Sequence, residues 1–76
     1  MSTQIILPKS GMGIDEGTIL RWLKNEGERV TQGEPIVEIE TAKATQEVES
    51  PASGVLKIIL AQGETAAVNT AIGLIE

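Results

Sequence analysis

Short apolar runs separated by turn-forming residues dominate the hydrophobic pattern of the chain. Gly, Pro, Asn and Ser stand between the runs, and several short strands at such spacing are typical of an all-β sandwich or barrel. The stretch 18–26 also has the spacing of a short amphipathic helix with Thr18 as its cap. The apolar runs are Ile5–Leu7, Ile19–Leu23, Ile36–Ile39, Val55–Leu60 and Ile72–Ile75.

An internal repeat decides between helix and strand for this stretch. Residues 27–40 match 63–76 at five of 14 positions, and the match continues upstream, with one gap, between 17–23 and 54–60. The second copy of the upstream segment is β-branched and strand-like, which favours a strand in the first copy too. Two half-sheets that cannot each bury an apolar face predict a pseudo-twofold pair of small antiparallel sheets, forming one flattened barrel or sandwich.

The first half of the repeat contains extra residues at one place. The segment from Pro8 to Gly17 is six residues longer than the corresponding segment from Pro51 to Gly54. The difference predicts an inserted loop at 9–16, whose glycines permit unusual backbone conformations.

Composition limits the kind of core. The 76 residues amount to 8.0 kDa, which predicts a single domain over 1–76. Hydrophobic residues make up 41% of the chain, with one Trp and no Phe or Tyr, so Ile, Val, Leu and Ala must fill the core. Trp22, aligned with Ile59 in the repeat, is interpreted as a packing residue.

Charge and missing residue types exclude several functions. Without His or Cys, the chain lacks the usual general base, the thiol nucleophile and the common zinc ligands. A net charge of −5 disfavours nucleic acid as a partner. No apolar stretch approaches the roughly 20 residues of a membrane span, and we expect a cytoplasmic protein. The acidic residues around 38–49 are interpreted as a solvated face, and no metal site is predicted.

A hairpin is predicted at 35–51, between the two halves of the repeat. A two-residue turn at Ala42-Lys43 places the acidic positions on one, solvated face, because like charges repel across a ladder. The predicted pairs are Thr41 with Ala44, Ile39 with Gln46 and Val37 with Val48 on one face, and Glu38 with Glu47 and Glu40 with Thr45 on the other.

Lys43 at the tip is the candidate functional residue. A tight hairpin normally has Asn-Gly, Asp-Gly or another Gly pair there, and Ala42-Lys43 satisfies none of these preferences. A type I geometry, which tolerates most residues, is the alternative. The small neighbours Ala42 and Ala44 leave the amine approachable. The competing interpretation is an ordinary solvated surface lysine.

The segment Glu40-Thr41-Ala42-Lys43-Ala44 resembles the lipoylation motif Glu-Thr-Asp-Lys-Ala in the acyltransferase components of 2-oxo acid dehydrogenase complexes. Family members commonly have a glycine 16 positions before the modified lysine, a glutamate three before it and a glycine 11 after it, and Gly27, Glu40 and Gly54 match. The similarity covers nearly the whole chain and implies a flattened barrel of two sheets. Ala42 departs from the family, which usually has Asp there.

This resemblance implies a carrier domain rather than an enzyme, with lipoic acid in amide linkage on Lys43. It also implies that the modifying enzyme recognises the domain partly through Gly27, Glu40 and Gly54. A lipoate ligase or lipoyl transferase would attach the group. The arm would then carry acyl groups and electrons between a thiamine-diphosphate decarboxylase, an acyltransferase core and dihydrolipoamide dehydrogenase. The parent chain would be a dihydrolipoamide acyltransferase of the acetyltransferase type, with this monomeric domain at its N-terminus, in the bacterial cytosol or, after loss of a transit peptide, in the mitochondrial matrix.

Some assignments stay open. Residues 17–23 resemble pyruvate-type domains, whereas 8–12 resemble acetoin-type domains. Biotinyl domains share the fold but usually have Met on both sides of the lysine, and an unmodified β interaction module is the third alternative. The inserted loop at 9–16 is the candidate for partner recognition, because the corresponding family loop lies beside the lysine turn. The residues assigned to recognition are Gly11, Met12, Gly13, Ile14 and Asp15.

Overall fold

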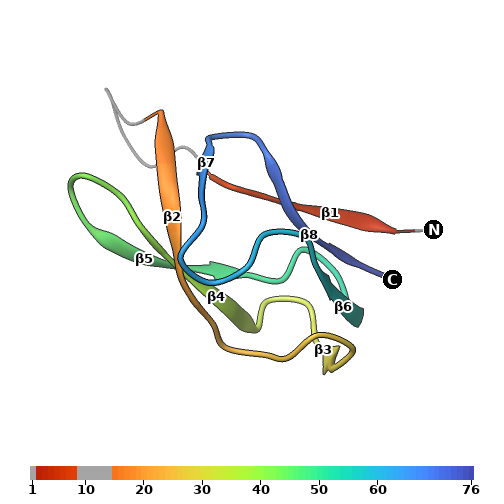
Figure 1. Cartoon of the computed structure of the whole chain (residues 1–76). Coiled ribbons are helices and arrows are strands. Elements are labelled where there is room, and N and C mark those ends of the chain that lie inside the picture. The colour runs from red at the N-terminus through yellow and green to blue at the C-terminus, as the bar shows by residue number, and fades with distance from the viewer. Residues whose placement is uncertain (1, 9–14) are drawn as a thin grey trace.

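The computed structural model describes residues 2–8 and 15–76, and its regular secondary structure consists of strands (Figure 1). The short strands β3 and β7 were not among the predicted apolar runs, since two or three residues are too few to show a hydrophobic period. The strands are β1 Thr3–Ile6, β2 Glu16–Trp22, β3 Arg29–Val30, β4 Pro35–Glu40, β5 Thr45–Glu49, β6 Gly54–Ile58, β7 Thr65–Ala67 and β8 Ala71–Ile75.

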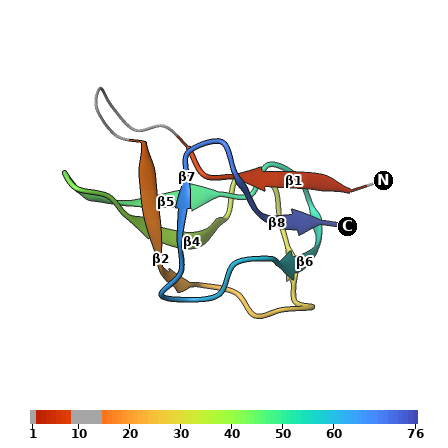
Figure 2. The same cartoon turned by 45° about the horizontal axis from the view of Figure 1, so that its top comes forward.

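The strands form two four-stranded antiparallel sheets, which confirms the predicted fold class. One sheet has the order β1-β8-β6-β3 and the other β5-β4-β2-β7; Figure 2 shows them from a second direction. The stretch with helical spacing is the strand β2, as the repeat predicted. Glu16, which was assigned to the inserted loop, is instead the first residue of β2 and pairs with Ala67.

A pseudo-twofold relates the two sheets, and the backbone hydrogen bonds repeat with it. The order β5-β4-β2-β7 corresponds strand by strand to β1-β8-β6-β3. Glu28 N–H donates to the Asn25 carbonyl at 3.0 Å. The equivalent bond, 36 residues later, joins Glu64 N–H to the Ala61 carbonyl at 3.1 Å. The sequence repeat is therefore also a repeat of structure.

Strand β2 contains one residue that β6 lacks. Its pairing with β4 shifts register at Leu20, whereas β6 pairs with β8 without interruption. By register, the counterpart of Trp22 is Ile58. The predicted counterpart, Ile59, was wrong by one position, because a β-bulge takes up the extra residue inside the strand and the alignment had placed the gap after it.

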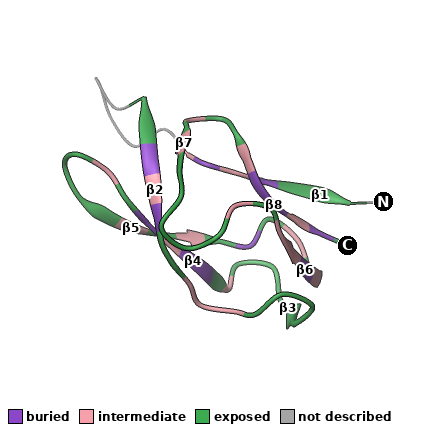
Figure 3. Ribbon diagram, in the orientation of Figure 1, coloured by how far each residue is buried: buried purple, intermediate pink, exposed green. Residues whose placement is uncertain are grey.

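Aliphatic side chains from both sheets fill one core, drawn in purple in Figure 3. Trp22 packs against it half-buried, and its Nε1 donates to the Leu60 carbonyl at 2.8 Å, which confirms a packing role. Dense packing of branched aliphatics thus replaces the missing Phe and Tyr. The buried members are Ile5, Leu7, Ile19, Val30, Ile36, Val37, Ile39, Leu56, Ile72 and Ile75.

Two glycines allow equivalent close approaches near the starts of β2 and β6. A Cβ atom on Gly17 would lie 2.9 Å from Ile39 Cγ2. One on Gly54 would lie 2.9 Å from Ile75 Cγ2 and 2.5 Å from the Glu76 carbonyl oxygen. Because Ile39 and Ile75 are partners in the repeat, the same packing requirement occurs once in each half.

The described chain ends lie side by side, far from the β4–β5 turn. Strand β1 pairs with β8 through Thr3 and Ile75, and Figure 1 shows both ends on the side of the molecule opposite that turn. The described residues contain no helix long and apolar enough to cross a membrane.

Candidate functional site

The hairpin of β4 and β5 has the predicted register. Its pairs include Val37 with Val48, Glu38 with Glu47, Ile39 with Gln46 and Glu40 with Thr45. Beyond the last pair, Thr41 N–H donates to the Ala44 carbonyl at 2.8 Å. Ala42 and Lys43 are therefore the two residues of the turn, and both are exposed.

The turn does not use the left-handed conformation that tight hairpins usually require. In the described chain, positive φ values occur at Asn69 and at glycines, so Ala42 and Lys43 form neither a type I′ nor a type II′ turn. The half-buried Thr41 contributes its side chain instead. Its hydroxyl donates to the Ala44 carbonyl at 3.1 Å and accepts the Lys43 and Ala44 N–H groups at 3.4 and 3.3 Å.

The outer face of the hairpin is acidic and largely solvated, as predicted. Glu40 and Glu47 are exposed. Glu38 is more covered, with 20% of its side chain exposed, because Arg21 Nε donates to its carboxylate at 2.7 Å. Within the described ranges, no three His, Cys, Asp or Glu residues are grouped so that they could hold a metal ion.

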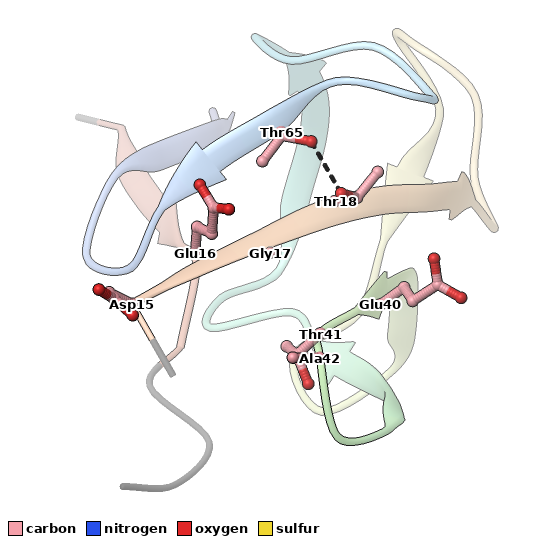
Figure 4. A pocket seen from close by; sticks show the side chains of 8 residues that line it. All are labelled: Asp15, Glu16, Gly17, Thr18, Glu40, Thr41, Ala42 and Thr65. Atoms are coloured by element: carbon pink, nitrogen blue, oxygen red, sulfur yellow. Dashed lines mark hydrogen bonds between the residues drawn. The ribbon is translucent and has the colours of Figure 1, made fainter. Parts of the chain in front are cut away.

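A groove with a volume of about 420 Å³ opens beside the turn. The start of β2, β7 and the end of β4 form its walls. A hydrogen bond of 2.8 Å between the Thr18 and Thr65 hydroxyl groups connects β2 with β7, and Figure 4 marks it with a dashed line. The Glu40 side chain extends away from Asp15 in this view. The groove combines carboxylates, hydroxyls and the turn itself; its lining residues are Asp15, Glu16, Gly17, Thr18, Glu40, Thr41, Ala42 and Thr65.

One residue of the predicted recognition loop reaches this groove. Asp15 lines the groove. Its backbone is held next to the end of β7, because the Asp15 carbonyl accepts the Val68 N–H at 2.9 Å. The other four predicted residues, Gly11, Met12, Gly13 and Ile14, lie outside the described part of the chain.

Gly27 and Gly54, which were expected to contribute to recognition for modification, do not gather at the turn with Glu40. Gly27 precedes β3, has φ +84°, and its N–H donates to the Leu56 carbonyl at 2.8 Å. Gly54 begins β6 and contacts the end of β8. Both positions belong to the sheet that carries the chain ends, where positive φ at Gly27 and a close backbone contact at Gly54 favour glycine.

Thr41 is a site residue that the sequence interpretation missed. The signal was present, since Thr followed by two residues of low turn propensity is compatible with a side-chain-closed turn. The Thr18–Thr65 hydroxyl pair left no comparable signal, because 47 residues separate its members and β7 was not predicted.

Comparison with known proteins finds a family model and a solved structure that each match nearly the whole chain. The family model described as "Biotin-requiring enzyme" matches residues 3–75. The solution structure of the lipoyl domain of the 2-oxoglutarate dehydrogenase complex from Azotobacter vinelandii superposes with a TM-score of 0.77 at 35% identity, covering 96% of this chain and 94% of that domain.

Longer relatives contain a similar segment. The pyruvate dehydrogenase E1 component subunit beta of Rhizobium meliloti is 44% identical over 99% of this chain. The dihydrolipoyllysine-residue acetyltransferase component of the pyruvate dehydrogenase complex of Rickettsia prowazekii is 51% identical over 82% of it. The chain spans only 17% and 15% of the length of these two proteins.

Proposed function

Because the chain belongs to the biotinyl- and lipoyl-attachment family, we propose that it is a lipoyl carrier domain bearing lipoic acid in amide linkage on Lys43. The observation that carries this proposal is the exposed lysine at the turn joining the two pseudo-equivalent halves, with the small residues Ala42 and Ala44 on either side. Such a site fits a covalently attached group, since the amide needs an accessible amine and no enclosing pocket.

Attachment requires chemistry that the turn does not contain. The Lys43 amine must lose a proton before its nitrogen attacks the carbonyl carbon of an activated lipoyl group. The amide C–N bond then forms, the bond to the activating group breaks, and that group departs with the bonding electrons. With no His or Cys in the chain, the lipoate ligase or transferase supplies the base. The attached group then supplies a dithiolane that takes up an acyl group and electrons.

The carrier role follows from tethering. A dithiolane held on the domain has a higher effective concentration at each active site that the domain can visit. We propose as partners a thiamine-diphosphate decarboxylase, an acyltransferase core and dihydrolipoamide dehydrogenase. The Azotobacter domain belongs, by its description, to a 2-oxoglutarate dehydrogenase complex.

The parent chain is proposed to be a dihydrolipoamide acyltransferase of the acetyltransferase type, in a pyruvate or acetoin complex. Residues 1–76 would be a monomeric N-terminal domain of it. The proposed compartment is the bacterial cytosol or the mitochondrial matrix. Similarity to the Rickettsia acetyltransferase supports this assignment. The Rhizobium relative is a pyruvate dehydrogenase E1 component subunit beta by name, which makes a chain of that kind the alternative parent.

The groove beside the turn is the proposed surface for the decarboxylase. Asp15, at the end of the predicted recognition loop, and Ala42, in the turn, line the same groove. A partner that binds in this groove therefore contacts both Asp15, from the predicted loop, and Ala42, next to the modified lysine. Ala42, where related domains usually have Asp, leaves one carboxylate fewer at this edge.

Intact mass tests the attachment site directly. We expect co-expression with a lipoate ligase and lipoate to add one lipoyl group to the chain, and Lys43→Arg to abolish the addition. Lys57→Arg is the matched control, because Lys57 lies on β6 near Glu26 (Nζ to carboxylate oxygen 3.9 Å) in the other sheet. Addition of biotin in a parallel culture with a biotin ligase would favour the biotinyl alternative. No addition in either culture would favour an unmodified interaction module.

A further inference from the structure

We propose that Thr41 is a positioning residue that fixes the orientation of Lys43 for the enzyme that modifies it. This inference rests on the proposed attachment of a lipoyl group to Lys43. It follows from how one hydroxyl group closes a turn whose two residues lack the usual turn chemistry.

The Thr41 hydroxyl uses its full hydrogen-bonding capacity inside the turn. A hydroxyl group has one donor hydrogen and two acceptor lone pairs. Here Oγ1 donates to the Ala44 carbonyl at 3.1 Å, and accepts the Lys43 N–H at 3.4 Å and the Ala44 N–H at 3.3 Å. The two accepted bonds are longer than typical N–H···O hydrogen bonds, so each is weak, but all three bonds of the hydroxyl act on the same short turn.

This arrangement substitutes for backbone conformation. In the usual hairpin turn, residues with positive φ match the twist of the strands. Ala42 and Lys43 do not adopt positive φ, and neither side chain has an oxygen that could accept a backbone N–H as that of Asn or Asp does. Thr41 is also half-buried at the base of the turn, whereas residues 42–45 are exposed. The hydroxyl therefore links an anchored residue to the exposed turn.

The link bears on modification because the Lys43 N–H is one of the groups it holds. Because the same hydroxyl also accepts the Ala44 N–H, the peptide planes before and after the Lys43 Cα are both held, which restricts φ and ψ of Lys43 and hence the direction of its Cα–Cβ bond. A modifying enzyme then meets the amine in fewer orientations. Loss of orientation at a reacting group lowers the rate even where the group itself is intact.

The test uses Thr41→Val, which keeps the branched shape and removes the hydroxyl, and Thr41→Ser, which keeps the hydroxyl. We expect Thr41→Val to lower kcat/KM for lipoylation by about tenfold, and Thr41→Ser to stay within about twofold of the parent. Thr45→Val is the matched control in the same hairpin, and we expect it to be modified at the parent rate. Unfolding followed by Trp22 fluorescence should show all four proteins folded at the assay temperature.

A second readout does not depend on modification. Amide ¹⁵N relaxation at Lys43 and Ala44 should show greater fast motion in Thr41→Val, and parent-like motion in Thr41→Ser and Thr45→Val. Greater motion in Thr41→Val, together with a parent that is not lipoylated, would contradict the proposed function while still showing that Thr41 orients the Lys43 turn. Unchanged motion, or a parent rate of lipoylation in Thr41→Val, would overturn the positioning role.

Discussion

Gly33 and Asn69 adopt the same left-handed backbone conformation at positions 36 residues apart, with φ of +88° and +69°. Their N–H groups make equivalent bonds, from Gly33 to the Ser50 carbonyl at 2.9 Å and from Asn69 to the Leu7 carbonyl at 2.8 Å. Gly and Asn are the residues that tolerate this conformation best. The two halves of the barrel therefore meet one backbone requirement with different side chains.

Substitution at Asn69 should reveal this requirement. We expect Asn69→Ala to lower the free energy of unfolding by about 1 kcal/mol, because a Cβ without a compensating amide is strained at positive φ. Asn69→Gly should leave it within about 0.5 kcal/mol of the parent. Urea titration followed by Trp22 fluorescence measures both, with Gln62→Ala as the control at an exposed turn position of ordinary φ. Equal effects of the Ala and Gly variants would contradict the prediction.

Gly54→Ala should destabilise the fold more than Gly17→Ala. At position 54 a Cβ would lie 2.5 Å from the Glu76 carbonyl oxygen, which is backbone, whereas at position 17 it would meet the Ile39 side chain at 2.9 Å. We expect losses of roughly 3 and 1 kcal/mol in the free energy of unfolding, since a side chain yields more easily than paired backbone.

The same variant separates two roles for Gly54. If Gly54 is needed only for folding, the fraction of the Gly54→Ala protein that remains folded should be lipoylated at the parent rate. A folded variant that is modified slowly would instead support direct recognition of this position. Gly63→Ala is the control for backbone strain alone, because its φ is +91° and nothing lies within 4 Å of a Cβ there.

Asp15→Asn should slow reductive acylation by the decarboxylase while the midpoint of unfolding stays within about 2 °C of the parent value. Asp15 is exposed and lines the groove beside the turn, so its side chain contributes little to packing. We expect a loss of about three- to tenfold in kcat/KM, typical of a rim charge in a recognition surface. Glu49→Gln, on β5 and outside this groove, is the control. Equal rates for Asp15→Asn and the parent would remove Asp15 from that surface.

Stability should fall at acid pH partly through Glu34. The Thr31 N–H, donating to its carboxylate at 3.1 Å, and then Lys24 at 3.2 Å hold the pKa of Glu34 below its ordinary value of 4.5. Because the folded state favours the charged form, this contribution is present above about pH 4.5 and is lost as the pH falls through the lowered pKa.

Thermal midpoints measured from about pH 6 to pH 3 test this effect. Glu34→Gln should flatten the decline with pH, and Lys24→Met should flatten part of it, because the Thr31 hydrogen bond remains. An unchanged decline in Glu34→Gln would show that other groups account for the pH dependence.

The long strands and the hairpin register could be predicted because alternation constrains them strongly. A shift of one residue in β4 would expose Ile39 and bury Glu38, so one register is strongly favoured. The repeat supplied the rest of the architecture, since a match such as that of Ile36 with Ile72 implies equivalent strands.

The missed features are those that leave no periodic trace. Leu20 lies at the register shift in β2. The sequence is the same whether the extra residue lies inside the strand or after it, so the sequence alone does not locate the bulge. Residues 29–30 and 65–67 are too short to show a period. The hydroxyl of Thr41 acts through the geometry of a turn, which depends on dihedral angles that the sequence pattern does not determine.

The position of the chain ends affects how far the lysine can travel. The domain is 32 Å in its longest dimension, and the paired ends and the lysine turn lie on opposite sides of it (Figure 1). A domain anchored through those ends acts as a rigid spacer, so its own length adds to the swing radius of whatever the amine carries. Shortening the barrel would reduce that reach even with the hairpin left intact.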